Sequence, residues 1–164
     1  MRVVAAQLLL AIAGGISATA GADPKLDMIA FFTGKTHADN VMKIALQHPH
    51  KLVVDSVGGR NKEGDLVLID NVQEEGKPAR KRTWAMHAVG SGHFTGSLSD
   101  AKGPVDVVVV GDSSTIRYTM KDGGLQVVQR VQLKPDGRTL SNHVDARKFG
   151  MRFATVEGTI RKLD

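Results

Sequence analysis

The stretch that decides the fold is RKRTWAMHAVGSGHFTGSLSDAKGP, residues 80–104. It has the pattern of a strand that carries the only tryptophan, Trp84, followed by a glycine-rich turn, a second strand and a polar corner closed by Gly103 and Pro104. Short runs of alternating residues separated by Gly, Pro, Asp and Ser are typical of antiparallel β-structure. Alternating runs separated by such turn-forming residues recur on both sides of this stretch, which predicts one antiparallel unit along most of the chain.

Alternation of apolar and polar residues predicts the other strands. It is clearest in residues 125–133 (LQVVQRVQL), whose odd-numbered residues are apolar apart from Gln129. We expect residues 33–36 to form a turn, Gly58 and Gly59 to end a strand, and no helix beyond a short helical turn near residues 145–149. With the two strands of residues 80–104, about ten strands are predicted, the others over residues 41–46, 52–57, 65–72, 105–110, 115–121, 124–133, 138–145 and 153–163.

Ten short antiparallel strands form either a closed meander barrel or a two-sheet sandwich. Turns of a few residues favour the meander, because a Greek-key sandwich needs at least one long return connection. We therefore expect an all-β fold, a single antiparallel up-and-down β-barrel of about ten strands. A chain of 164 residues without internal repeat or linker predicts one such domain, over residues 23–164.

The first 22 residues, MRVVAAQLLLAIAGGISATAGA, have the plan of a secretory signal peptide: a basic start, an apolar run, and small residues at Ala20 and Ala22. The apolar run is short and interrupted by glycine, so it does not resemble a spanning helix, although an uncleaved anchor is the alternative. We expect cleavage after Ala22, a periplasmic or secreted product, and no membrane span after cleavage.

Composition excludes several classes of site. The chain has no cysteine, so it forms no disulfide, thiolate metal site or cysteine nucleophile, and it has no lipid-modified N-terminal cysteine. Its 22 Lys and Arg exceed its 17 Asp and Glu by five, and these basic residues neither gather on one face nor alternate with aromatic residues. Nucleic acid is therefore not an expected partner, and we expect a monomer.

Several blocks resemble a known family. They are FFTGKT at residues 31–36, the pair Arg82 and Trp84, Thr95-Gly96 followed by an Asp100 to Pro104 corner, and KFG at residues 148–150. Together they are similar to a family of small bacterial envelope proteins, often lipoproteins, known as domain of unknown function 3833. The resemblance implies a lipocalin-like barrel and no particular activity. The chain departs from the family pattern at Asn71, at residues 75–77 (EGK), and in lacking the lipid-modified cysteine, which favours a free soluble protein.

Arg82 and Trp84 are two residues apart, so on a strand they point to the same face. Stacking of the guanidinium on the indole contributes roughly 0.5 to 2 kcal/mol. Two interpretations remain open: the pair closes the bottom of the barrel, or Arg82 binds an anionic head group beside Trp84. The candidate ligand-binding residues are Arg82, Trp84, Met86, Tyr118 and Asp100, and the expected interior lining is Met42, Ile44, Leu68, Trp84, Met86, Tyr118 and Val127.

The sequence gives only weak indications of a metal site or a hydrolase site. His48 and His50 flank Pro49, and His87 and His93 flank a tight turn, but neither pair has the three or four converging ligands of a zinc site. No metal, haem or other cofactor is expected. A triad of serine, histidine and Asp100 lacks a nucleophile elbow, and a loop aspartate such as Asp100 more often holds backbone amides.

The sequence therefore predicts an exported protein of the bacterial cell envelope that binds a lipid or another small apolar or amphipathic ligand inside its barrel. Two alternatives remain. One is an enzyme acting on a small lipid-like substrate through Arg82, Asp100 or a histidine. The other is an envelope scaffold that pairs with a partner through an exposed strand edge. The basic residues of 77–82 are either an anion-binding patch or a solvated edge that resists pairing with other chains.

Overall fold

The computed structural model describes residues 24–164, so the predicted signal peptide lies outside the described residues. One short helix, α1 (Met28–Phe32), is followed by ten strands, as many as the sequence predicts. The strands are β1 (Gly34–Ile44), β2 (His50–Arg60), β3 (Leu66–Glu74), β4 (Arg80–Gly90), β5 (His93–Leu98), β6 (Val105–Val110), β7 (Ser113–Thr119), β8 (Gln126–Leu133), β9 (Thr139–Lys148) and β10 (Met151–Lys162).

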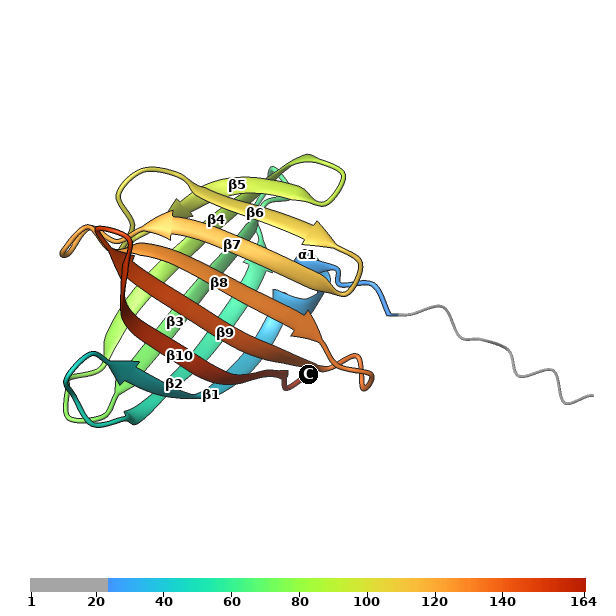
Figure 1. The fold of residues 1–164 in the computed structure, drawn as a ribbon. Helices are drawn as coiled ribbons and strands as arrows, with labels where there is room; N and C mark the ends of the chain where they lie inside the picture. Colours follow the sequence, from blue (N-terminus) through green and yellow to red (C-terminus); the bar gives the residue numbers. More distant parts are fainter. Residues whose placement is uncertain (1–23) are drawn as a thin grey trace, which may run out of the picture.

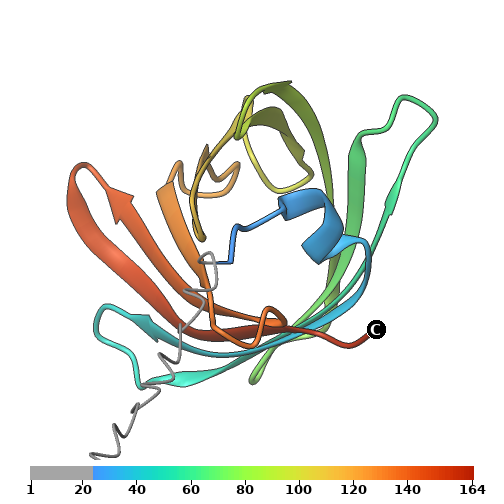
Figure 2. The ribbon, with the colours of Figure 1, turned by 90° about the vertical axis from the view of Figure 1, so that its right-hand side faces the viewer.

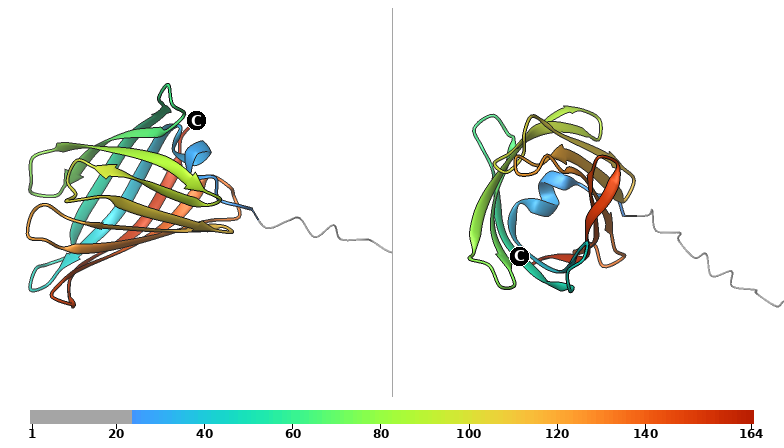
Figure 3. Two further views of the ribbon diagram at one scale, coloured as in Figure 1. Left: turned by 90° about the horizontal axis from the view of Figure 1, so that it is seen from above. Right: turned by 60° about the vertical axis from the view of Figure 1, so that its left-hand side comes forward.

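The strands form a closed antiparallel barrel (Figures 1 and 3). Each strand pairs with its neighbour in sequence, and β1 also pairs with β10, from Thr36 opposite Lys162 to Ile44 opposite Ala154. The predicted up-and-down barrel is confirmed. Because every described strand has a neighbour on both sides, the barrel offers no exposed strand edge of the kind that the scaffold interpretation requires.

The local predictions for β1 and β9 are wrong in part. β1 begins at Gly34, where a turn was expected, and β9 continues to Lys148 in place of a helical turn. Leu46 lies beyond the end of β1, has a φ of 65° and is fully exposed, so it does not share the inner face with Met42 and Ile44. Alternation in the sequence continues past the last residue that is paired, which is why pattern alone overextends the strand.

Helix α1 was not expected from the sequence. Asp27 caps it, its Oδ1 accepting a hydrogen bond from the Ala30 amide at 3.0 Å. A single turn is too short to show helical periodicity, and such a helix is stabilised by tertiary contacts. Met28, Phe31 and Phe32 supply these contacts because all three are buried. The helix lies across one mouth of the barrel (Figure 2).

Alternation places the core inside the barrel. In β8, Val127, Val131 and Leu133 are buried while Gln126, Arg130 and Gln132 are exposed, which confirms the predicted faces. The prediction that Gly58 and Gly59 end a strand is wrong, because β2 continues to Arg60, with α1 packed over it. Within residues 24–164, no helix has the length and apolar character needed to cross a membrane.

Candidate functional site: the barrel interior

The barrel encloses a cavity of about 340 Å³, near the lower end of the range for small-molecule sites. It extends from Met28 and Phe32 of α1 to Ile44, Lys77 and Phe153 at the opposite end. Lys77 and Phe153 are exposed, so the cavity reaches solvent there. All seven residues expected to line the interior do so: Met42, Ile44, Leu68, Trp84, Met86, Tyr118 and Val127.

Asp70 organises one wall of the cavity. It lies on β3 opposite Arg82 on β4, and its Oδ2 accepts hydrogen bonds from Arg82 Nε at 2.6 Å and from Trp84 Nε1 at 2.8 Å. Its Oδ1 accepts a third from Ser56 Oγ at 2.7 Å. Only 3% of the Asp70 side chain is exposed. A buried carboxylate is tolerated because these three donors replace its hydration.

Sequence reasoning did not single out Asp70 as a site residue. A signal was available, because Leu66, Leu68 and Val72 alternate on the inner face of β3 and Asp70 falls in the same series. A carboxylate in an inward-facing apolar series must find a partner in the interior. The partner, Arg82, is twelve residues away, and pairing of β3 with β4 in this register brings the two together.

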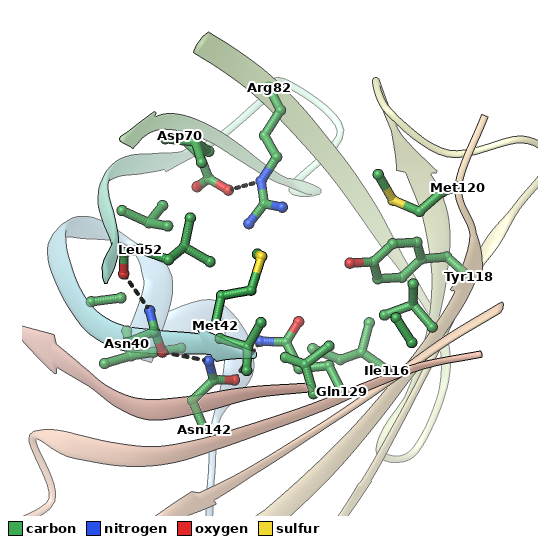
Figure 4. Close-up of a pocket in the computed structure, with 18 of the residues that line it drawn as sticks. Asn40, Met42, Leu52, Asp70, Arg82, Ile116, Tyr118, Met120, Gln129 and Asn142 are labelled. Carbon is green, nitrogen blue, oxygen red and sulfur yellow. Dashed lines mark hydrogen bonds and ion pairs between the residues drawn. The ribbon is translucent and has the colours of Figure 1, made fainter. Parts of the chain in front are cut away.

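Arg82 is held so that part of its guanidinium remains available. Nε is bound to Asp70, and the guanidinium carbon lies 5.3 Å from the Trp84 ring centre, which confirms the stacked pair. Neither Nη atom has a hydrogen-bond partner among residues 24–164, and both point into the cavity (Figure 4). Burial alone would lower the pKa of Arg82, but the neighbouring Asp70 carboxylate more than compensates and raises it.

The Arg82 and Trp84 pair is not what covers the mouth of the barrel where α1 lies. Both side chains belong to the cavity wall, and the end of the barrel is covered instead by α1 through Met28 and Phe32. Figure 2 shows the helix in that mouth. The structure therefore places the pair in the cavity wall, and both interpretations of its role remain predictions.

Tyr118 and Met86 complete this part of the cavity. The Tyr118 ring packs edge-on against Trp84, with centres 5.6 Å apart and planes at 89°. Its hydroxyl points into the cavity and has no hydrogen-bond partner in the described part of the chain (Figure 4). Burial raises the pKa of Tyr118 above its ordinary value, although Arg82 acts in the opposite direction. The phenol therefore stays protonated at neutral pH and can donate a hydrogen bond.

Asp100 is separate from the cavity. It lies in the corner between β5 and β6, where its carboxylate binds Arg80 Nη1 and accepts from Ser99 Oγ at 3.2 Å. The expectation that it holds backbone amides is wrong, because its partners are side chains. Asp100 instead positions Arg80, which does line the cavity. Three basic side chains (Lys77, Arg80 and Arg82) and two acidic ones (Asp70 and Glu74) line the cavity in all.

None of the six histidines lines the cavity. His87 and His93 do not approach each other as a pair, because His87 contacts Asp65 and His93 contacts Asp106, each at 2.6 Å. Residues 24–164 contain no cluster of three or more residues able to hold a metal ion. The residues that the enzyme interpretation invokes, Arg82, Asp100 and a histidine, thus do not converge on one pocket.

A second polar group crosses the opposite wall. Asn40 on β1 and Asn142 on β9 both pair with Gly158 on β10, which lies between them. Asn142 Nδ2 donates to Asn40 Oδ1 at 2.9 Å over this glycine, and Gln129 Nε2 on β8 donates to Asn142 Oδ1 at 2.7 Å. A Cβ at position 158 would lie 2.6 Å from Asn40 Oδ1, so glycine is what permits the contact. We call Asn40, Asn142 and Gln129 the amide row.

Fold and cavity define the class of protein: a lipocalin-like barrel of ten strands, covered by a helix at one end and hollow inside. The chain belongs to the family described as protein of unknown function DUF3833, whose model matches residues 7–162. The family resemblance seen in the sequence is thereby confirmed.

Solved structures show the same fold at low identity. A protein of unknown function from the DUF3598 family of Nostoc punctiforme has a TM-score of 0.63 and 12% identity, with 90% of this chain and 53% of that chain covered. This chain thus spans about half of that protein. Rv2717c from M. tuberculosis has a TM-score of 0.59 and 12% identity, with 82% and 94% covered. The S-type phycobiliprotein lyase CPES from Guillardia theta has a TM-score of 0.62 and 4% identity, with 83% and 90% covered. No curated protein matches the chain in sequence.

Proposed function

We propose that this protein binds a small amphipathic ligand inside the barrel, with an acidic group of the ligand on Arg82 and Tyr118 and an apolar body along the aliphatic wall. The observation that carries the proposal is the arrangement of Arg82, whose two Nη groups have no partner among residues 24–164 and point into a mostly apolar cavity. The likeness to a phycobiliprotein lyase is compatible with ligand binding by this fold.

The electrostatics favour an anion. Asp70 neutralises Arg82 as a pair, but it occupies only Nε and leaves the fork of Nη donors for a carboxylate or phosphate. Tyr118 adds a neutral donor, while the other two basic residues of the cavity are ion-paired, Lys77 with Glu74 and Arg80 with Asp100. A hydrogen bond to a charged group contributes about 1.5 to 3 kcal/mol, so removing the acid from a ligand should lower its affinity measurably even when its apolar chain is unchanged.

The first experiment identifies bound material. Protein purified from its native host is analysed by native mass spectrometry and by solvent extraction. We expect a co-purifying amphipathic acid. A barrel that is empty in every preparation and takes up no added amphipathic acid would refute the proposal.

The second experiment separates binding from support of the fold. Dodecanoate and dodecanol are titrated against the wild type and against the double variant Asp70→Asn/Arg82→Met, which removes both members of the buried pair. We expect dodecanoate to lose about tenfold or more in affinity and dodecanol to change little. Equal loss for both probes, or loss of melting temperature with binding unchanged, would show that the pair serves only the fold.

Location and oligomeric state are proposed on the sequence alone. We propose that the protein acts in the periplasm or outside the cell as a monomer, after removal of residues 1–22. N-terminal sequencing of the protein from fractionated cells should begin at Asp23, and its sedimentation should correspond to one chain. A cytoplasmic protein with an intact N-terminus would contradict this placement.

A further inference from the structure

The amide row has a direction that the backbone fixes. Asn40 Nδ2 donates to the backbone carbonyl of Leu52 at 3.3 Å, and a carbonyl can only accept. The nitrogen of Asn40 must therefore face Leu52, which turns its oxygen towards Asn142. By the same logic Asn142 offers its oxygen to Gln129. Each amide in the row is thus oriented by the one before it.

The free end of this row is an acceptor. Gln129 Nε2 is bound to Asn142, so Gln129 Oε1 is left without a partner among residues 24–164. Gln129 lines the cavity, and its oxygen points into the interior that Arg82 and Tyr118 also face (Figure 4). Successive donation along the row polarises the terminal amide and strengthens its oxygen as an acceptor.

We propose that Gln129 Oε1 is a second polar subsite of the cavity, which takes a hydroxyl or N–H group on the ligand. This inference rests on the proposed function and narrows it: the ligand is an acid that also carries a hydrogen-bond donor on its apolar body. A ligand with an apolar group at this point removes water from the amide oxygen without replacing its hydrogen bond. Such a ligand therefore binds more weakly than a ligand with a hydroxyl there.

The test compares dodecanoate with dodecanoates that carry one hydroxyl at different positions, each titrated against the wild type, Gln129→Leu and the control Gln126→Leu. Gln126 is exposed on the outer face of the same strand. We expect one positional isomer to bind the wild type about three- to tenfold more tightly than dodecanoate. Gln129→Leu should abolish this preference and Gln126→Leu should keep it.

The readout is the ratio of the affinities for the hydroxylated dodecanoate and for dodecanoate, because partial unfolding of a variant lowers both affinities together. If dodecanoate binds but no isomer is preferred, or if Gln129→Leu keeps the preference, the subsite is refuted and the proposed function stands. If none of these acids binds the wild type, both fail.

A different observation concerns the outside of the barrel at the end opposite α1. The turns that follow β1 and precede β10 are adjacent, since the Ala45 amide donates to the Phe153 carbonyl at 2.9 Å. These turns and the start of β10 carry four exposed apolar side chains, Leu46, Phe149, Met151 and Phe153, which we call the apolar rim. Leu46 and Phe149 have positive φ values of 65° and 51°, which present them at the tips of the turns.

Cations flank the apolar rim along the chain, and of these Arg152 is ion-paired with Asp145 at 3.0 Å. Residues 43–48 and 147–153 contain Lys43, Arg147, Lys148 and Arg152 and no aspartate or glutamate. Lys148 lies over the Phe149 ring, 5.7 Å from its centre. Apolar tips among cations fit the interface of a membrane that contains anionic lipid, where the apolar groups insert and the cations meet head groups. The cavity reaches solvent at this same end, through Phe153.

We infer that the apolar rim docks the barrel on an anionic lipid surface with its cavity facing the lipid. The experiment is co-sedimentation with vesicles of phosphatidylcholine, with and without phosphatidylglycerol. We expect binding only to the anionic vesicles and weaker binding at high salt. Lys43→Gln and Lys148→Gln should each reduce it about fivefold.

The rim variants are Leu46→Asn and Phe149→Asn, because asparagine accepts a positive φ and the fold should be retained. Together they should lower vesicle binding about tenfold. Val110→Asn, at an exposed apolar position at the other end of the barrel, is the control and should bind as the wild type does. Failure of the wild type to bind anionic vesicles, or equal binding by the rim variants, would overturn this inference.

Discussion

The carbonyl oxygen of Phe32 lies only 1.9 Å from the point where any side chain at Gly58 would place its Cβ. The last residue of α1 therefore rests directly on the backbone of β2, at a position where only glycine allows the contact. This approach is how a helix of five residues comes to cover one mouth of the barrel.

Gly58→Ala should displace α1 or strain β2 and lower the free energy of unfolding by about 1 to 3 kcal/mol, as overpacking does. The neighbouring Gly59 has no atom within 4 Å of its would-be Cβ, so Gly59→Ala is a matched control with little expected effect. Urea unfolding measures both. Equal stability of the two variants would show that α1 is not held by this contact.

Asp70→Asn should be one of the most destabilising polar substitutions in the barrel. It removes the negative charge that compensates Arg82. Because only 19% of the Arg82 side chain is exposed, its positive charge would be left largely buried, and breaking such a pair costs about 3 kcal/mol or more. Asp100→Asn is the comparison, because Arg80 is 46% exposed and such pairs contribute about 1 kcal/mol or less. Thermal unfolding should rank the two variants in this order, and the reverse order would contradict the role assigned to Asp70.

Tyr118→Phe tests the hydroxyl that points into the cavity. The hydroxyl has no hydrogen-bond partner in the described chain, and the ring keeps its edge-on contact with Trp84. We therefore expect a change in stability below about 0.5 kcal/mol. Dodecanoate affinity should fall about three- to tenfold, since one donor to the acid is lost. A variant that loses stability and keeps its affinity would place the hydroxyl in the fold rather than the site.

His37 on β1 should make stability depend on pH. The hydrogen bond with Asp55, 2.6 Å from Nδ1, raises the pKa of His37, and Asp39 at 3.3 Å from Nε2 acts in the same direction, against a smaller lowering by burial. A raised pKa in the folded state means that the stabilisation is complete below the unfolded value of about 6.5 and is lost as pH rises through the folded pKa.

His37→Gln should accordingly cost about 0.5 kcal/mol in acidic solution and nothing in mildly alkaline solution, a size typical of partly exposed ion pairs. An NMR titration of the wild type should show His37 protonating above the pH of an unperturbed histidine. The same cost at both pH values would indicate that the ring acts through packing alone.

Much of the barrel follows from local pattern. Apolar and polar residues alternate over 125–133, and the odd-numbered ones form the inner face of β8. The glycine-rich segment within residues 80–104 forms the turn between β4 and β5. These features depend on residues close in sequence, so the chain alone displays them. The same holds for Arg82 and Trp84, whose spacing of two places them on one face of a strand.

The partners of these residues were not predictable in the same way. Asp70 joins Arg82 through the register of β3 and β4, and Asn40 joins Asn142 across 102 residues over Gly158. No local pattern encodes such contacts, because they depend on which strands become neighbours and on their alignment. Asp100 illustrates the reverse, since it was a candidate ligand-binding residue by its sequence, but it binds Arg80 and does not line the cavity itself.

The sequence by itself determined the barrel, because strand alternation and short turns leave few other ways to bury so many valines, leucines and isoleucines. The tertiary structure decided the rest. Closure of β1 on β10 brought distant polar residues to one interior, and Gly58 and Gly158 allowed backbone and side chains to meet where a Cβ would intervene. Asp70 binds Nε of Arg82 and Asn142 binds the nitrogen of Gln129, which leaves the Arg82 Nη groups and the Gln129 oxygen without partners among residues 24–164.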